Sequence, residues 1–106
     1  MNNGVIFYCD DDDDDLMMFS DIIRQIDPQL QCVTANDCED ALQMLSGGNI
    51  SPDLIFLDIN MPKMSGIELL AWLKRYHAFQ QVPIIMYSTS INNAKRITVL
   101  NLVRVQ

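Results

Sequence analysis

The stretch Pro52-Asp-Leu-Ile-Phe-Leu-Asp58-Ile-Asn-Met-Pro62-Lys-Met-Ser-Gly66 decides the fold of this chain. Its apolar run, Leu54 to Leu57, is too short for a helix and has no polar alternation, which is typical of a strand buried on both faces. Asp58 follows at the carboxyl end of that strand, and Pro62 favours an extended chain before it. Ligands of open parallel α/β sheets bind outside the carboxyl ends of the strands. We therefore expect Asp58 to display its carboxylate at a functional edge.

Six further segments alternate between strand and helix patterns on either side of this strand. Strands are expected over residues 5–9, 30–35 and 82–87, and helices over about 12–26, 38–45 and 65–76. Strands that alternate with helices at this spacing indicate βα units, a parallel sheet and right-handed crossovers. The sequence thus predicts an α/β fold with a doubly wound parallel sheet.

Two of the predicted helices carry specific signals for their ends and their buried faces. The first has apolar residues at one helical face, namely Leu16, Phe19, Ile23 and Ile26. The third opens with the Ser-x-x-Glu spacing of a capping box at Ser65 and Glu68. Its apolar surface is expected from Ile67, Leu70, Ala71, Trp72 and Leu73.

Length, charge and cysteine content exclude several classes of protein. A chain of 106 residues fits one domain, and its net charge of −7 argues against direct binding to nucleic acid. No apolar run is long enough to span a membrane, and the N-terminus lacks a signal-peptide pattern. The odd number of cysteines, 3, argues against a disulfide framework or a zinc site. Buried thiols in a reducing cytoplasm are the expectation.

Polar residues stand at the carboxyl ends of three predicted strands: Asp10 and Asp11, Asp58, and Ser88 and Thr89. If the sheet order reverses beside the first strand, the first and third strands are neighbours and their carboxylates converge. Carboxylates held close together repel one another unless a cation is present. Oxygen ligands of this kind suit Mg²⁺, and a nearby hydroxyl can bond a phosphoryl group. The pattern favours phosphoryl transfer to a carboxylate, giving an acyl phosphate.

From about Val5 to Ser90 the sequence resembles the receiver domains of two-component response regulators. The resemblance is most specific in the quoted stretch around Asp58, in the acid pair Asp10-Asp11, and in Val82-Pro-Ile-Ile-Met-Tyr-Ser88-Thr89. It implies a flavodoxin-like sheet of order 2-1-3-4-5. The expected function is that of a cytoplasmic signalling protein rather than an enzyme acting on other molecules.

The resemblance also implies a role for each matching residue. Asp58 would accept a phosphoryl group from a sensor histidine kinase or a phosphotransfer protein, and would then assist its own dephosphorylation. Mg²⁺ would be bound by Asp11 and Asp58, by Asp10 mainly through water, and by the backbone carbonyl of Asn60. Ser88, with Thr89 beside it, would bind the phosphoryl oxygens and move on activation. Output would pass to a downstream protein partner.

The end of the sequence departs from the family pattern. The family has a Lys-Pro pair beyond the switch hydroxyl, and residues 89–106 contain no such pair; Lys95 lies nearer to Ser88 than that lysine would. We expect a single receiver domain over residues 1–106, truncated or altered after about residue 95, with its fifth strand missing or irregular. Without a regular fifth strand, the fourth strand would be an exposed edge of the sheet. Such an edge favours self-association through the C-terminal end. The alternative function is a pseudo-receiver, an interaction module that works without phosphorylation.

Overall fold

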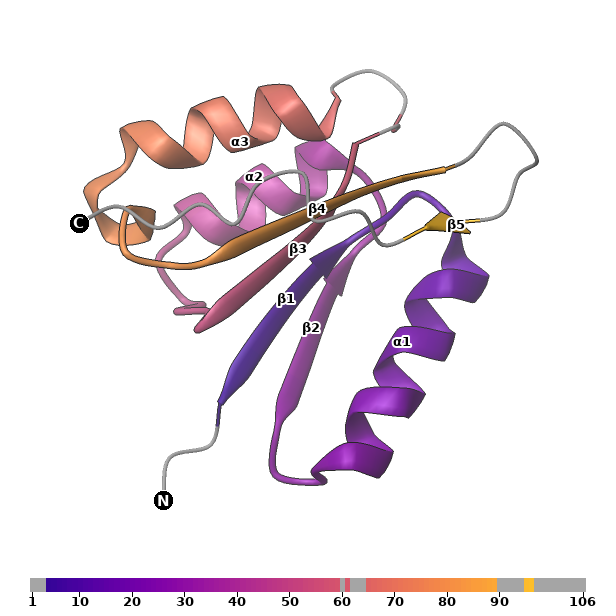
Figure 1. Ribbon diagram of the computed structural model, residues 1–106. Coiled ribbons are helices and arrows are strands. Elements are labelled where there is room, and N and C mark those ends of the chain that lie inside the picture. The colour runs from indigo at the N-terminus through magenta and orange to yellow at the C-terminus, as the bar shows by residue number, and fades with distance from the viewer. Residues whose placement is uncertain (1–3, 60, 62–64, 90–94, 97–106) are drawn as a thin grey trace.

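The structure is a computed structural model that describes residues 4–59, 61, 65–89 and 95–96. Strands and helices alternate along these residues as the sequence predicts (Figure 1). In chain order they are β1 (Val5–Cys9), α1 (Asp13–Ile26), β2 (Gln31–Ala35), α2 (Cys38–Ser46), β3 (Leu54–Asp58), α3 (Gly66–Arg75), the short 3₁₀ helix η1 (His77–Phe79), β4 (Ile84–Thr89) and β5 (Lys95–Arg96).

The sheet has the order β2-β1-β3-β4-β5. Strands β1 to β4 run parallel, so the order reverses between β1 and β3 and the predicted doubly wound architecture is confirmed. The fifth strand is irregular, also as expected: β5 has 2 residues and pairs antiparallel with β4, Ser88 lying opposite Arg96. The predicted self-association through residues beyond Arg96 falls outside the described residues.

Side-chain caps fix the first residue of each helix. The Asp12 carboxylate accepts hydrogen bonds from the backbone N–H groups of Asp14 (2.9 Å) and Asp15 (3.3 Å), and Asp37 accepts one from Asp40 at 2.7 Å. The predicted capping box of α3 is present, because Ser65 and Glu68 each accept the other's backbone N–H. Local sequence therefore sets where each loop ends and each helix begins.

The two faces of the sheet are covered by different helices (Figure 1). Helices α2 and α3 bury Ala41, Leu45, Leu69 and Leu73 against alternate residues of the strands, such as Ile55 and Leu57, in one large core cluster. Helix α1 lies on the opposite face, where Leu16 and Phe19 pack against Tyr8 and Phe56. No helix among the described residues is long and apolar enough to cross a membrane.

Three expectations about element boundaries and buried faces need correction. Ile26 in the last turn of α1 is 70% exposed, and Ile67 of α3 is 58% exposed. Helix α3 instead buries Gly66, Leu69 and Leu73, at spacings of three and four residues. Strand β4 begins at Ile84 rather than Val82, after Pro83, which has no N–H to donate to a ladder.

Candidate metal centre

Three carboxylates meet at the carboxyl end of the sheet. Oxygen atoms of Asp10, Asp11 and Asp58 lie within 4.8 Å of one another. The register explains the convergence: Cys9 pairs with Leu57, so the residue that follows each of them reaches the same edge. Asp10 and Asp58 are both 0% exposed, whereas Asp11 is exposed. The structure thus encloses Asp58 rather than displaying it, and Asp11 forms the rim of the site.

The carboxylate of Asp10 is held by two donors. The Tyr8 hydroxyl donates a hydrogen bond to Oδ2 at 2.6 Å, and the backbone N–H of Asp12 donates to Oδ1 at 3.0 Å. The backbone N–H of Asp10 in turn bonds the Ala35 carbonyl at 3.1 Å, which ties it to the end of β2. With a donor on each oxygen, the Asp10 carboxyl group is held in one orientation at the buried side of the site.

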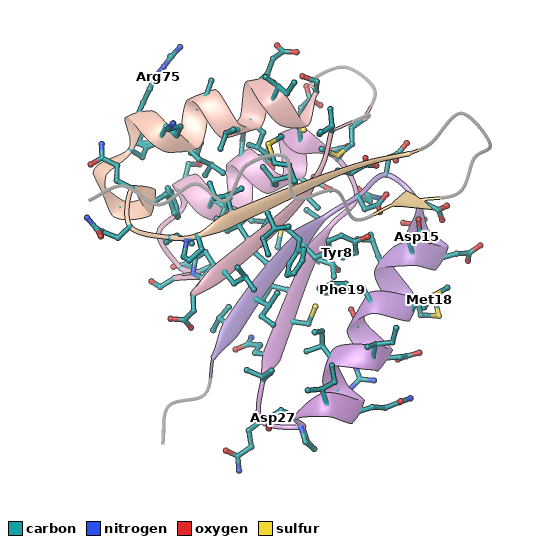
Figure 2. The ribbon with its side chains drawn as sticks, in the orientation of Figure 1. Tyr8, Asp15, Met18, Phe19, Asp27 and Arg75 are labelled. Carbon is teal, nitrogen blue, oxygen red and sulfur yellow. The ribbon has the colours of Figure 1, made fainter. Side chains whose placement is uncertain are left out.

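Tyr8 is a site residue that the sequence reasoning missed. Its ring lies between the sheet and α1 (Figure 2), with centroids 4.2 Å from Phe19 and 6.4 Å from Phe56. Phe19 also meets Phe56 edge-on at 5.0 Å. One signal was available: residues i and i+2 of a strand point to the same side, which pairs Tyr8 with Asp10. The aromatic cluster of Tyr8, Phe19 and Phe56 thereby positions a carboxylate.

The end of β3 is positioned by the start of α3. Gly66 is buried, and its N–H donates to the Ile59 carbonyl at 3.0 Å. A Cβ at Gly66 would overlap the carbonyl oxygen of Asp58 and lie 2.9 Å from the Ile59 Cα. Only glycine lets the helix approach the strand so closely. Gly66 is therefore a residue that positions Asp58.

The run of aspartates, residues 10–15, is divided between the acid cluster and helix α1. Asp10 and Asp11 belong to the acid cluster, whereas Asp12 is the N-cap of α1 and residues 13–15 form its first turn. Negative charge in that turn is favoured by the helix dipole. The four later acids are accounted for by the helix itself.

The remaining predicted site residues lie partly outside the described structure. The backbone of Ser88 and Thr89 ends β4, and Asp58 pairs with Tyr87, so Ser88 follows at the same edge of the sheet. Their side chains are outside the described residues, and so is Asn60.

Behind the carboxylates lie two buried thiols, Cys9 and Cys38. They share a hydrogen bond, which raises the pKa of the Cys9 thiol and lowers that of Cys38. Burial raises the pKa of Cys9 further.

A pocket of about 330 Å³ opens at the opposite end of the sheet. It is lined mainly by apolar residues, including Ile50, Pro52, Trp72, Tyr76 and Phe79. Pro52 precedes β3 whereas Asp58 ends it, so this pocket is separate from the acid cluster. None of the predicted site residues lines it.

Comparison with known proteins assigns the family. The model of the response regulator receiver domain matches residues 6–104. Among curated proteins, the chain is 36% identical over 86 residues to protein-glutamate methylesterase/protein-glutamine glutaminase 2 of Vibrio vulnificus, covering 80% of this chain and 23% of the relative. It is 39% identical over 57 residues to protein PilG of Pseudomonas aeruginosa, covering 54% of this chain and 41% of that relative. The chain thus spans under half the length of either relative.

Solved structures agree with this assignment. The phosphorylated cyanobacterial phytochrome response regulator RcpA superposes with a TM-score of 0.77 at 30% identity, over 86% of this chain and 69% of that one. A two-component response regulator from Legionella pneumophila gives a TM-score of 0.73 at 33% identity, over 83% and 71%. The chain belongs to the receiver domain family of response regulators, and it matches only the receiver part of its longer relatives.

Proposed function

We propose that this receiver domain accepts a phosphoryl group on Asp58 from the phosphohistidine of a sensor kinase or a phosphotransfer protein. The reaction requires Mg²⁺ and takes place in the cytoplasm. Phosphorylation then changes the surface through which the domain contacts a downstream protein. The domain assists its own phosphorylation and dephosphorylation, and it is not an enzyme for other substrates.

One observation carries the proposal: the convergence of Asp10, Asp11 and Asp58 within 4.8 Å at the switch point of the sheet. Burying two carboxylates side by side costs free energy unless the site holds positive charge. Such a cost is expected at a functional site, where polar groups are held in place for chemistry. The three carboxylates offer hard oxygen ligands, and Asp11 is exposed to water. This combination fits Mg²⁺, which keeps part of its water shell when it binds to proteins.

In the proposed step, an oxygen of the Asp58 carboxylate attacks the phosphorus atom. The new O–P bond forms as the P–N bond to the donor imidazole breaks, and the imidazole leaves with the electron pair and takes up a proton. Catalysis of such a transfer consists mainly of positioning and charge stabilisation. The close approach of Gly66 fixes the end of β3, which would orient the Asp58 carboxylate for this attack.

The acids around Asp58 have separate tasks. Mg²⁺, when bound, would supply positive charge that stabilises the transferring phosphoryl group. Asp11 and Asp58 would hold it directly, with Asn60 through its backbone carbonyl. Asp10 already accepts bonds from Tyr8 and Asp12, so it would act mainly through water. Ser88 and Thr89 would supply hydroxyl donors to the phosphoryl group.

Acetyl phosphate tests the acceptor directly, because it replaces the kinase as phosphoryl donor. Incubation of the full chain with acetyl phosphate and Mg²⁺ should add the mass of one phosphoryl group, read by intact mass spectrometry. Asp58→Asn should abolish the addition, and chelation of Mg²⁺ should prevent it in the parent. Modification that persists in Asp58→Asn would assign the acceptor elsewhere.

The metal role is tested by two aspartates of the same run. Asp11→Ala should weaken Mg²⁺ binding at least tenfold by calorimetry, whereas Asp14→Ala, in the first turn of α1, should leave it within about twofold. Equal losses for the two variants would mean that the run attracts cations only diffusely.

A pseudo-receiver, an interaction module that works without phosphorylation, is the second candidate. In that case the domain binds its partner through the same surface whether or not Asp58 is modified. A chain that takes up no phosphoryl group from acetyl phosphate, and still binds Mg²⁺, would support this second function.

A further inference from the structure

Three sulfur atoms lie together in the core behind the acid cluster. The Sγ of Cys9 is 3.6 Å from the Sδ of Met61, and the Sγ of Cys38 is 4.0 Å from the same atom. Cys9 and Cys38 are themselves joined by a hydrogen bond. The three residues come from the end of β1, the start of α2 and the loop after β3. We call them the sulfur triad.

The separations of the two thiol sulfurs from Met61 are those expected of ligands around one small ion. Sulfur ligands bind a metal at about 2.3 Å, and three ligands at that distance around a trigonal ion are about 4 Å apart. The two separations from the Met61 Sδ, 3.6 and 4.0 Å, match this spacing. The exposed fractions are 0% for Cys9, 1% for Cys38 and 8% for Met61, so Met61 is the outermost ligand.

The chemistry of the ligands and the surrounding charge select the class of ion. Thiolate and thioether sulfur are soft ligands that favour Cu(I) and related ions, whereas Zn²⁺ takes four ligands and does not use thioethers. A monovalent ion that replaces one thiol proton leaves the net charge of this buried region unchanged. A divalent ion in exchange for one proton would add a full buried charge, which is costly in an apolar core.

We propose that the sulfur triad of Cys9, Cys38 and Met61 is a binding site for one soft monovalent metal ion, Cu(I) or Ag(I). On binding, an S–H bond of one thiol breaks, its electron pair forms the sulfur–metal bond, and the proton passes to solvent. The other thiol sulfur and the Met61 thioether each donate a lone pair. The site does not depend on the proposed phosphorylation of Asp58.

Silver nitrate in chloride-free buffer is the probe, because Ag(I) needs no reducing conditions. Cys32, half-buried on β2 and 3.6 Å from the Ser20 hydroxyl, is a thiol outside the triad and would bind silver by itself. The titration is therefore made in Cys32→Ser full-length chain. Native mass spectrometry should show one Ag(I) that survives competition from a small thiol.

The decisive comparison uses two methionines of the same core. Met61→Leu keeps nearly the same volume and removes only the thioether, and it should weaken Ag(I) binding at least tenfold. Met44→Leu, a half-buried methionine packed against the same core but outside the triad, should leave binding within twofold. Cys38→Ser should lose the tightly held ion, with circular dichroism confirming that each variant is folded.

The results separate a metal site from mere packing. Equal affinity of the parent, Met61→Leu and Met44→Leu would overturn the proposal, and the sulfur atoms would then only fill the core. A parent chain that loses all silver to the competing thiol would overturn it as well. Because Met61→Leu changes little volume, this comparison holds even if Cys38→Ser fails to fold.

Discussion

Among the described residues, the two faces of the sheet differ in how completely they are covered. Under α2 and α3, 14 buried residues of the described chain form one cluster. Under α1 the corresponding cluster has 2 buried residues, Tyr8 and Leu16. Of the six large apolar residues that are exposed in the part of the chain that the structure describes, four belong to α1: Met17, Met18, Ile22 and Ile26. Figure 2 shows Met18 on the outer side of α1, whereas Phe19 points toward the sheet.

This difference indicates that one face mainly stabilises the fold and that the other positions the acid cluster. The α2–α3 face contributes most of the buried apolar area, so it should carry most of the free energy of folding. The α1 face contributes little area, yet its aromatic cluster holds the hydroxyl that anchors Asp10. Substitutions on the first face should therefore lower stability, and those on the second should disturb the acid site at a smaller cost in stability.

The largest loss of stability is expected on the α2–α3 face. Leu69 is 0% exposed in α3, and Leu69→Ala should lower the free energy of unfolding by about 2–5 kcal/mol, since it removes buried methyl groups and leaves a cavity. Urea denaturation followed by circular dichroism measures the change. A loss below about 1 kcal/mol would mean that this face relaxes around the cavity and is not the tightly packed one.

A smaller loss with a larger effect on the acid site is expected on the α1 face. Tyr8→Phe keeps the ring stacked against Phe19 and removes only the hydroxyl that donates to Asp10. A hydrogen bond to a carboxylate contributes about 1.5–3 kcal/mol to stability. We expect a loss in that range together with weaker Mg²⁺ binding by calorimetry, while Leu69→Ala should leave the metal affinity of the folded protein unchanged. Unaltered Mg²⁺ binding in Tyr8→Phe would show that the aromatic cluster does not contribute to metal binding at the acid cluster.

Substitution of the N-cap residue of α1 should cause the next largest loss of stability. Asp12→Ala removes the acceptor for two backbone N–H groups and should cost about 0.5–2 kcal/mol. Asp14→Ala keeps the cap and removes only a favourable charge in the first turn, which contributes about 0.3–1 kcal/mol. Thermal unfolding at low salt compares the two variants. If Asp14→Ala is the more harmful, the later aspartates act through something other than capping.

Sequence predicted the elements better than it predicted their buried faces. Caps at Asp12, Asp37 and Ser65 coincide with changes of periodicity, so the helices were located almost to the residue. Helix α3 is apolar nearly all round, and spacing alone could not choose between Ile67 and Leu69. The choice depends on the contact of Gly66 with the end of β3, which is a tertiary feature.

The sequence predicted the acid cluster, but it did not predict the residues that hold the cluster in place. Asp10, Asp11 and Asp58 follow strands whose adjacency comes from the topology, so their convergence could be derived. Tyr8 reads as one more apolar strand residue, and its bond to Asp10 appears only once the strand is folded. The sulfur triad joins three elements distant in sequence, and no local pattern brings them together.

The smallest effect is expected where α1 faces away from the sheet. Ile22 is 48% exposed, whereas Ile55 in β3 is 0% exposed, so the same change to alanine compares the two regions directly. Ile22→Ala should alter stability by less than about 0.5 kcal/mol, because a partly exposed side chain loses little buried area and alanine is the better helix former. Ile55→Ala should cost about 2–5 kcal/mol. Urea denaturation of both variants under one condition decides the matter: losses of similar size would show that the outer side of α1 is packed in solution, and the contrast between the two faces would not hold.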